Sequence, residues 1–516
     1  MNLLVIYLIR FFLKHFGIAI IYVIINWIMH KTFQSKLDQI EKSDIYPFHM
    51  PGHKRQSIGT PICDIYKRDI TEIDGYDNLH DPKEFILAEE QFGARLFGSE
   101  ECFYLVNGSS CGILASIMSV ADRPGRYLVA RNCHKSVFHG LYLSGKDAQY
   151  IYPEGCEDIP FSGSISVMEL EQKLSQDDYC AVIVTSPTYE GVVSDVRAIC
   201  EAAHKKGIPV IVDEAHGAHL GIWGGDGYFP DSAIRCGADI VIQSTHKTLP
   251  AMTQTALLHV QGDLIDRRKL KEHLAVFQSS SPSYILMESI SDALHFCAEH
   301  KEELVKAYRQ RLDAFYQGTE KLKCFYCIRP QILQKDFAYA FDPGKLVICI
   351  KDGIDLTGAG LSHILRTDYH IEPEMSEAQY VIAMTSVMDT AEGFTRLVSA
   401  LKEIDTRFAD SSKEMPDRDK KHRMPLLEHE LTIRQALACE GRKLRIQDTA
   451  CMVSQEYIYL YPPGIPLVVP GEQITGEVID YLQGKMEAGL LIKGPANIDQ
   501  NKIMCIGKAQ TERESL

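Results

Sequence analysis

The chain has 516 residues and a net charge of −15 at pH 7. Apolar residues make up 45% and charged residues 24%, the balance of a globular protein with room for about three domains. An acidic chain without a basic stripe argues against nucleic acid as a partner.

The first 29 residues, MNLLVIYLIRFFLKHFGIAIIYVIINWIM, are strongly apolar but contain Arg10, Lys14 and His15. The uninterrupted run of residues 16–29 is shorter than the ~20 residues of a membrane-spanning helix, and no small-residue cleavage site follows it. Three interpretations stay open: an interfacial anchor, a spanning helix that tolerates the charges, or translated non-coding sequence before the true start. Residues 1–34 are therefore set apart, and membrane contact is expected only through residues 1–29.

From residue 85 onward, helical and strand patterns alternate. Residues 82–98 have helical periodicity and end at a glycine, and continuous Val/Ile runs follow, separated by helices. Such runs indicate strands buried on both faces of a mostly parallel central sheet. We therefore predict an α/β fold, with a large domain over residues 35–285.

The remaining chain divides into three parts. Residues 286–409 are predicted to form a smaller α/β domain that begins with one long charged helix over residues 288–317. Residues 410–425, DSSKEMPDRDKKHRMP, are polar without periodicity and indicate a linker. Residues 426–516 are predicted to form a C-terminal α+β domain.

The 15 cysteines are scattered through apolar segments, which indicates buried thiols in a reducing compartment and a cytoplasmic protein. The C-x-x-C pair Cys324 and Cys327 has no second pair at zinc-finger distance. We therefore expect it to lie in a half-buried strand, and we expect no metal.

Four polar loops follow strands of the predicted large domain. NGSSCG (107–112) brings Ser109 and Ser110 to the start of a helix, which forms either a plain cap or an anion site suited to phosphate. RNCHKS (131–136) places His134 at a strand end, as a structural residue or as a group that stacks on a flat ring. VIVDEAHGAHLG (210–221) ends a strand at Asp213, either a cap or metal carboxylate or a partner for a protonated ring nitrogen.

The fourth loop, QSTHKTLPAM (243–252), places Lys247 at the end of a buried strand. Burial favours the neutral amine, which can form a Schiff base with an aldehyde. A phosphate cradle, a stacking imidazole, an aspartate and a lysine together match the needs of pyridoxal phosphate (PLP). Because ligands of such sheets bind where the strands end, the four loops predict one site.

At these motifs the sequence resembles the PLP-dependent Orn/Lys/Arg decarboxylases of the aspartate-aminotransferase fold (PLP fold type I), in the short form without a receiver-like N-terminal domain. The resemblance spans roughly residues 35–490. The stretches that carry it are PFHMPGHKR (47–55), DITEIDGYDNLHDP (69–82), FGSEECFYLVNGSSCG (97–112), ARNCHKSVFHG (130–140), TSPTYEGVVSD (185–195), VDEAHGAHLG (212–221), QSTHKTLPAMTQ (243–254), EPEMSE (372–377) and YPPGIPLVVPGE (461–472).

The resemblance implies a role for each site residue. Lys247 would be the Schiff-base lysine, Asp213 would pair with the ring nitrogen, and His134 would stack on the ring. The phosphate would be held by Ser109, Ser110 and Ser244, and His216 and His246 would lie beside the aldimine. Either Lys247 or His246 would protonate Cα after CO2 leaves, and Glu374 is the candidate partner of the substrate's distal cation.

The expected reaction is the Cα-decarboxylation of lysine, arginine or ornithine, by a homodimer or a multiple of it. PFHMPGHKR would lie near the mouth of the site or reach into a neighbouring subunit's site. Two alternatives stay open. One is an aminotransferase or another PLP lyase, for which Arg366 could clamp the α-carboxylate. The other is a PLP-binding regulatory homologue without catalysis.

Overall fold

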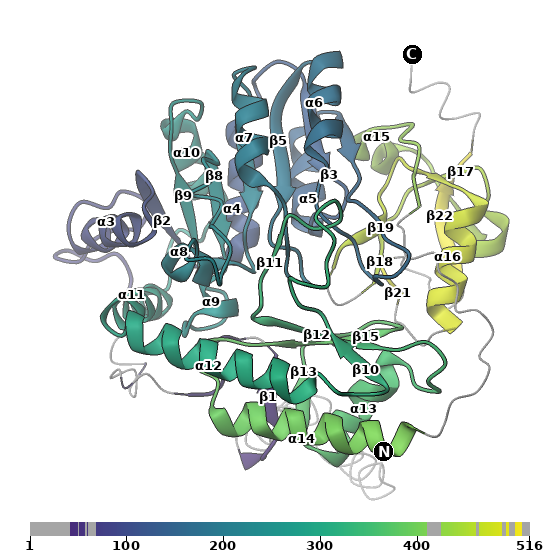
Figure 1. Ribbon diagram of the computed structural model, residues 1–516. Helices are drawn as coiled ribbons and strands as arrows, with labels where there is room; N and C mark the ends of the chain where they lie inside the picture. The colour runs from purple at the N-terminus through teal and green to yellow at the C-terminus, as the bar shows by residue number, and fades with distance from the viewer. Residues whose placement is uncertain are drawn as a thin grey trace, which may run out of the picture.

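The computed structural model describes residues 42–49, 51–56, 59, 65, 69–409, 425–460, 464–487, 492–494 and 501–507 (Figure 1). The apolar segment 1–29 and nearly all of the predicted linker 410–425 lie outside the described residues. Within the described ranges, no helix has both the length and the apolar character needed to cross a membrane.

A seven-stranded sheet forms the centre of the molecule, in the order β2-β9-β8-β7-β5-β3-β4. Only β9 runs antiparallel to its neighbours, so the predicted mostly parallel sheet is confirmed. The strands are β2 (Glu101–Leu105), β3 (Arg126–Ala130), β4 (Ala148–Ile151), β5 (Tyr179–Thr185), β7 (Val210–Asp213), β8 (Ile240–Gln243) and β9 (Ala256–Val260).

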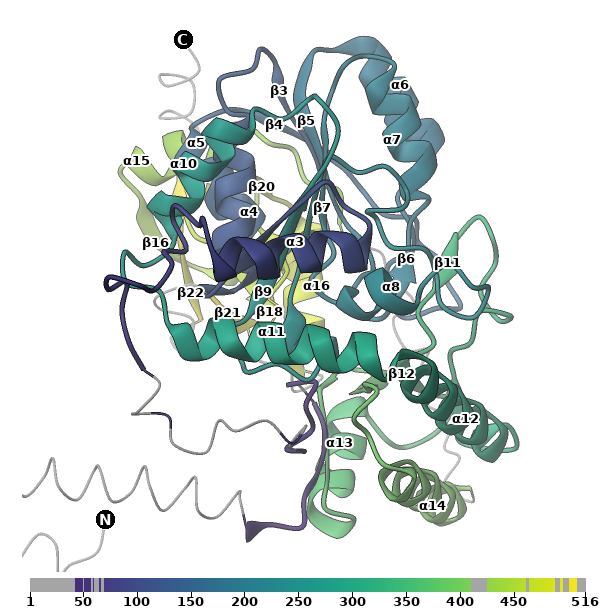
Figure 2. The same ribbon diagram turned by 90° about the vertical axis from the view of Figure 1, so that its left-hand side faces the viewer.

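Helices cover both faces of this sheet (Figure 2). On one side lie α4 (Gly108–Ser119), α5 (Lys135–Ser144) and α10 (Arg267–Phe277); on the other lie α6 (Val167–Gln176) and α7 (Val196–His204). This coverage explains the continuous Val/Ile runs, because both faces of β5, β7 and β8 are buried. Helix α3 (Phe85–Phe97) ends as predicted at Gly98, whose φ of 80° suits glycine.

The predicted long helix over residues 288–317 is wrong: two helices occupy this region. Helix α11 (Tyr284–Glu299) ends at His300, and α12 (Lys301–Thr319) begins directly after it. His300 has the non-helical angles φ −104° and ψ 18°. Glu302 and Glu303 lie in the first turn of α12, where carboxylates stabilise a helix N-terminus.

A four-stranded antiparallel sheet, β10-β12-β15-β14, follows in the chain. Its strands are β10 (Phe325–Cys327), β12 (Lys345–Ile350), β14 (Met375–Ser376) and β15 (Tyr380–Met384), with helices α13 (Gly358–Asp368) and α14 (Ala391–Phe408). Cys324 and Cys327 are buried free thiols at and beside β10, a strand of alternating burial as predicted.

The N-terminal described segment joins this smaller sheet region. Strand β1 (Tyr46–Phe48) pairs in parallel with β13 (Ile371–Pro373). Gly52 then packs against the chain just after Lys247: its N–H donates to the carbonyl of His246 at 2.6 Å. A β-carbon at this position would lie 2.7 Å from the carbonyl oxygen of Leu249, so only glycine permits this approach.

The C-terminal unit, in yellow at the right of Figure 1, contains two small sheets. One has the order β16-β22-β17-β20 and the other β19-β18-β21. Its elements are α15 (Ile433–Ala438), β16 (Arg442–Arg445), β17 (Met452–Ser454), β18 (Ile458–Leu460), β19 (Pro466–Val468), β20 (Gln473–Ile474), α16 (Gly476–Glu487), β21 (Ile492–Lys493) and β22 (Lys502–Ile506).

Candidate active site

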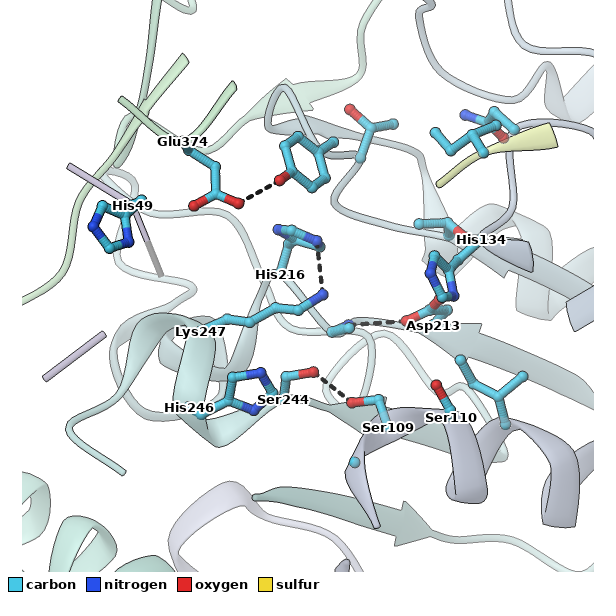
Figure 3. Close-up of a pocket in the computed structure, with 18 of the residues that line it drawn as sticks. His49, Ser109, Ser110, His134, Asp213, His216, Ser244, His246, Lys247 and Glu374 are labelled. Carbon is cyan, nitrogen blue, oxygen red and sulfur yellow. Dashed lines mark hydrogen bonds between the residues drawn. The ribbon is translucent and has the colours of Figure 1, made fainter. Parts of the chain in front are cut away.

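A cavity of about 610 Å³ lies where the strands of the large sheet end (Figure 3). All nine site residues predicted from the sequence line it. The lining residues are His49, Gly108, Ser109, Ser110, Ile113, Asn132, His134, Thr185, Thr188, Tyr189, Asp213, Ala215, His216, Ser244, His246, Lys247, Glu372, Pro373, Glu374 and Ile465.

Lys247 extends into the middle of the cavity from the short helix α9 (Thr245–Thr248), which directly follows β8 (Figure 3). Its Nζ lies 2.9 Å from Nε2 of His216. Burial lowers the pKa of Lys247, although the negative charges of Asp213 and Glu374 oppose this shift. The amine therefore reaches its neutral, nucleophilic form more easily than a lysine in solvent.

Asp213 is the last residue of β7 and is buried. Its Oδ1 accepts a hydrogen bond from the N–H of Ala215 at 3.1 Å. Burial raises the pKa of this carboxyl, while the positive charge of Lys247 and the hydrogen bond from Ala215 lower it. A second cationic group in the cavity would therefore stabilise the Asp213 carboxylate.

Two serines from separate loops meet at the start of α4. The hydroxyl of Ser109 lies 2.5 Å from that of Ser244, and Ser110 follows on the exposed side of the helix. Asn107, the residue before α4, makes no side-chain capping bond to it. The helix N-terminus and the hydroxyls thus form a surface suited to an anion, whereas a plain side-chain cap is not observed at Asn107.

His134 precedes α5 and caps it, since its Nδ1 accepts from the backbone N–H of Ser136 at 3.3 Å. Burial, followed by the positive charge of Lys247, lowers the pKa of His134 to about 3. The ring is therefore neutral near pH 7. The structural role that the sequence allowed is observed, because His134 caps α5, and the ring also faces the cavity (Figure 3).

His246 and His216 are also neutral near pH 7. Burial lowers the pKa of His246 to about 4, and its Nδ1 lies 2.8 Å from the carbonyl of Thr255. A carbonyl only accepts, so Nδ1 carries the proton and Nε2 is the free acceptor. Burial, then the charge of Lys247, lowers the pKa of His216 well below its usual range.

Two further lining residues, Tyr189 and His49, are ones that sequence reasoning did not single out. Tyr189 donates a hydrogen bond from its hydroxyl to Oε1 of Glu374, and its ring lies 4.6 Å from that of His216. His49 lines the cavity beside Glu374 (Figure 3). Tyr189 and His49 stand inside the motifs TSPTYEGVVSD and PFHMPGHKR, which were the available signal.

Comparison with known proteins identifies the family. The description "Orn/Lys/Arg decarboxylase, major domain" matches residues 32–355, and "Orn/Lys/Arg decarboxylase, C-terminal domain" matches residues 416–493. The chain belongs to the Orn/Lys/Arg decarboxylase family. It is therefore an enzyme of the amino-acid decarboxylase class, as the sequence motifs predicted.

The matches to two named relatives extend over most of this decarboxylase and nearly the whole of each relative. An arginine decarboxylase of Bacillus subtilis is 31% identical over 477 residues, which is 89% of this chain and 94% of the relative. An arginine decarboxylase of Bacillus anthracis is 30% identical, over 87% and 92% of the two chains. The solved lysine decarboxylase LdcF of Francisella novicida has a TM-score of 0.69 at 22% identity, over 83% and 72%, and this likeness shows the fold.

Arg366 is not among the lining residues of the decarboxylase's cavity. Its Nε donates to Oε2 of Glu372 at 2.6 Å, and its second nitrogen donates to Oε1 at 2.7 Å, in an exposed position. This bidentate pair occupies the guanidinium. The arrangement therefore gives no support to Arg366 as a carboxylate clamp.

Proposed function

We propose that this protein is a PLP-dependent decarboxylase that converts a basic amino acid into a diamine or related amine and CO2. One observation carries the proposal. The Lys247 amine, with its lowered pKa, lies in the same cavity as a serine-lined helix N-terminus, a neutral histidine ring and the buried Asp213. These are the four groups that PLP requires, in one place.

Buried polar atoms of the cavity fit such a cofactor. Among the described residues, Oδ1 of Asn132 and Nδ1 of His216 are buried without a hydrogen-bond partner. Both residues line the cavity. Unpaired buried polar atoms are costly, so a polar ligand that bonds them would stabilise the site. PLP, with phosphate, hydroxyl, aldehyde and ring nitrogen, supplies such partners.

Each site residue has a role in this proposal. PLP supplies an aldehyde for a lysine amine and a ring that accepts the electrons left when the carboxylate departs as CO2. Ser109, Ser110 and Ser244 would hold its phosphate and His134 would stack on its ring. Asp213 would hold a proton on the ring nitrogen, because a buried carboxylate favours a cation beside it.

Lys247 is the better proton donor to Cα. His246 carries its proton on Nδ1, which the carbonyl of Thr255 occupies, so its Nε2 has no proton to give at neutral pH. Lys247 can exchange a proton with His216 at 2.9 Å. Lys247 would therefore hold the proton that Cα receives in place of the departing CO2.

The substrate's distal cation would meet Glu374, whose carboxylate Tyr189 orients by its hydrogen bond. Two relatives of about 30% identity, from Bacillus subtilis and Bacillus anthracis, are named arginine decarboxylases, so arginine is the first substrate to test. Lysine and ornithine complete the panel. CO2 with the matching amine is the expected product, whereas keto-acid formation would identify an aminotransferase, and bound cofactor without any turnover a regulatory homologue.

The decisive experiment combines Lys247→Ala with borohydride. Wild-type protein purified with PLP should be yellow, and borohydride should fix the cofactor on the peptide that contains Lys247. The variant should lose this labelling and, on the order of 1,000-fold or more, its turnover. Mass spectrometry of the labelled peptide and CO2 release measure the two outcomes. A variant that turned over freely would refute the proposal.

The expected assembly rests on the resemblance, and the expected location rests on the cysteines, which indicate a reducing compartment. We expect a homodimer or a multiple of it, measurable by light scattering, and a cytoplasmic protein.

A further inference from the structure

Helix α5 carries His134 at its N-terminus and contacts the C-terminal unit at that same end. The N–H of Lys135 donates to the carbonyl of Gly464 at 3.2 Å. Gly464 has a φ of 84°, and a β-carbon added to it would lie 3.4 Å from Nε2 of His134. The backbone of the C-terminal unit therefore lies directly against the imidazole, and its next residue, Ile465, lines the cavity.

The C-terminal unit also contacts the opposite end of α5. Arg434 donates from Nε to the carbonyl of Tyr142 at 3.1 Å and from a second nitrogen to the carbonyl of Leu143. These carbonyls belong to the last turn of the helix, where a cation is stabilising. At the His134 end, Nζ of Lys135 also lies 5.3 Å from the ring centre of Tyr459.

A buried ion pair fixes the loop that leads into α5. Arg131 lies three residues before His134, and its guanidinium donates to both carboxylate oxygens of Glu472 at 2.9 and 2.8 Å. It also donates to the carbonyls of Pro466 at 2.6 Å and Leu467 at 2.9 Å. Both side chains are fully buried, and these four hydrogen bonds attach the guanidinium to the C-terminal unit.

We propose that the C-terminal unit sets the position of the His134 ring, with Arg131, Gly464 and Arg434 as positioning residues. The inference rests on the proposed function, in which His134 stacks on the cofactor. A segment distant in the sequence thus completes the cofactor site of the large sheet. The effect should be visible in how the cofactor is held, beyond any effect on folding.

Gly464→Ala tests the proposal at the point of contact. A side chain at this φ strains the loop, and its methyl group meets the imidazole. Gly353→Ala is the matched control, because Gly353 has a φ of 81° and no atom within 4 Å of an added β-carbon. The two variants share the backbone strain and differ in the contact with His134.

The readouts are the visible circular dichroism of bound PLP, the PLP dissociation constant and turnover. Gly464→Ala should reduce the visible dichroism at least about twofold and lower turnover roughly 10- to 100-fold, as small misplacements in active sites do. Gly353→Ala should match wild type in all three. If the two variants have the same dichroism and PLP affinity, the proposal is wrong.

Arg434→Ala provides a second arm, since Arg434 is exposed and its loss should leave the protein folded. It should weaken PLP binding less than Gly464→Ala, and Arg434→Lys should recover part of the loss. If neither Gly464→Ala nor Arg434→Ala changed the PLP affinity or the dichroism, the inference would be wrong. Wild-type protein that fails to bind PLP would instead refute the proposed function itself.

Discussion

The regions around Lys247 and Lys345 both enclose a lysine amine, yet they give it different chemistry. Nζ of Lys345 donates to Oδ2 of Asp342 at 3.0 Å and to the carbonyl of His216 at 3.0 Å. Among the residues that the structure describes, Nζ of Lys247 has one hydrogen-bond partner, the neutral ring of the same His216. A contacting carboxylate makes one amine a structural ammonium, while an imidazole neighbour leaves the other available as a nucleophile.

The sharpest test of this comparison is stability. Lys345→Met leaves Asp342 buried without its lysine, which should lower the free energy of unfolding by roughly 3–5 kcal/mol. Lys247→Met replaces an amine whose burial is unfavourable, so its unfolding free energy should stay within about 1 kcal/mol of wild type or rise. Urea unfolding of both cofactor-free variants measures the difference. Equal losses of unfolding free energy in the two variants would contradict the proposed difference between the two lysines.

Two neighbouring carboxyls extend the comparison to catalysis. Asp213→Asn keeps the shape of the side chain but removes the charge, so turnover should fall roughly 100- to 1,000-fold, while borohydride should still fix the cofactor on Lys247. Glu214→Gln is the control, because Glu214 bonds Ser232, Ala233 and Gln243 away from the cavity. The measurement is the steady-state rate of each variant with the preferred amino acid. An unchanged rate in Asp213→Asn would contradict the role proposed for Asp213.

The lowered pKa of Lys247 predicts a pH dependence of stability. Between the folded pKa and the unfolded value of 10.5, the unfolded chain binds more protons than the folded one, so the free energy of unfolding rises with pH. The slope from this one group is at most about 1.4 kcal/mol per pH unit. Relative to Lys247→Met, cofactor-free wild type should therefore gain stability as pH rises toward 10.5. A difference that moves in the opposite direction would contradict the lowered pKa.

The smallest effect is expected at Arg366. Its ion pair with Glu372 is exposed, and exposed pairs contribute about 1 kcal/mol or less. Arg366→Ala should therefore change the unfolding free energy by less than about 1 kcal/mol and leave kcat/KM nearly unchanged. Thermal unfolding and substrate kinetics measure both. A large loss in kcat/KM would support the hypothesis that Arg366 clamps the α-carboxylate, and with it the aminotransferase alternative.

The half of the site built on strand ends could be predicted from local sequence. Asp213 ends a buried strand, and His134, Ser109 and Lys247 each follow one; the topology of the sheet brings these positions to one edge. The roles came from the resemblance, since a strand-end aspartate or histidine alone has several explanations.

The rest of the site and its surroundings depend on contacts between distant segments. Tyr189 reaches Glu374 across 185 positions of the chain, and Arg131 finds Glu472 across 341 positions. No local periodicity encodes such pairs. The break between the helices at His300 was not predicted for another reason. The residues on both sides are good helix formers, so helix propensity favoured one continuous helix.

The parallel pairing of β1 with β13 has a practical consequence for anyone who shortens this protein. A polypeptide trimmed to begin at Met50 would lack the strand Tyr46–Phe48 and the His49 wall of the cavity. It would leave the backbone of residues 371–373 open to pairing with other chains, a known route to aggregation. Truncated versions should therefore keep the residues from Lys42 onward.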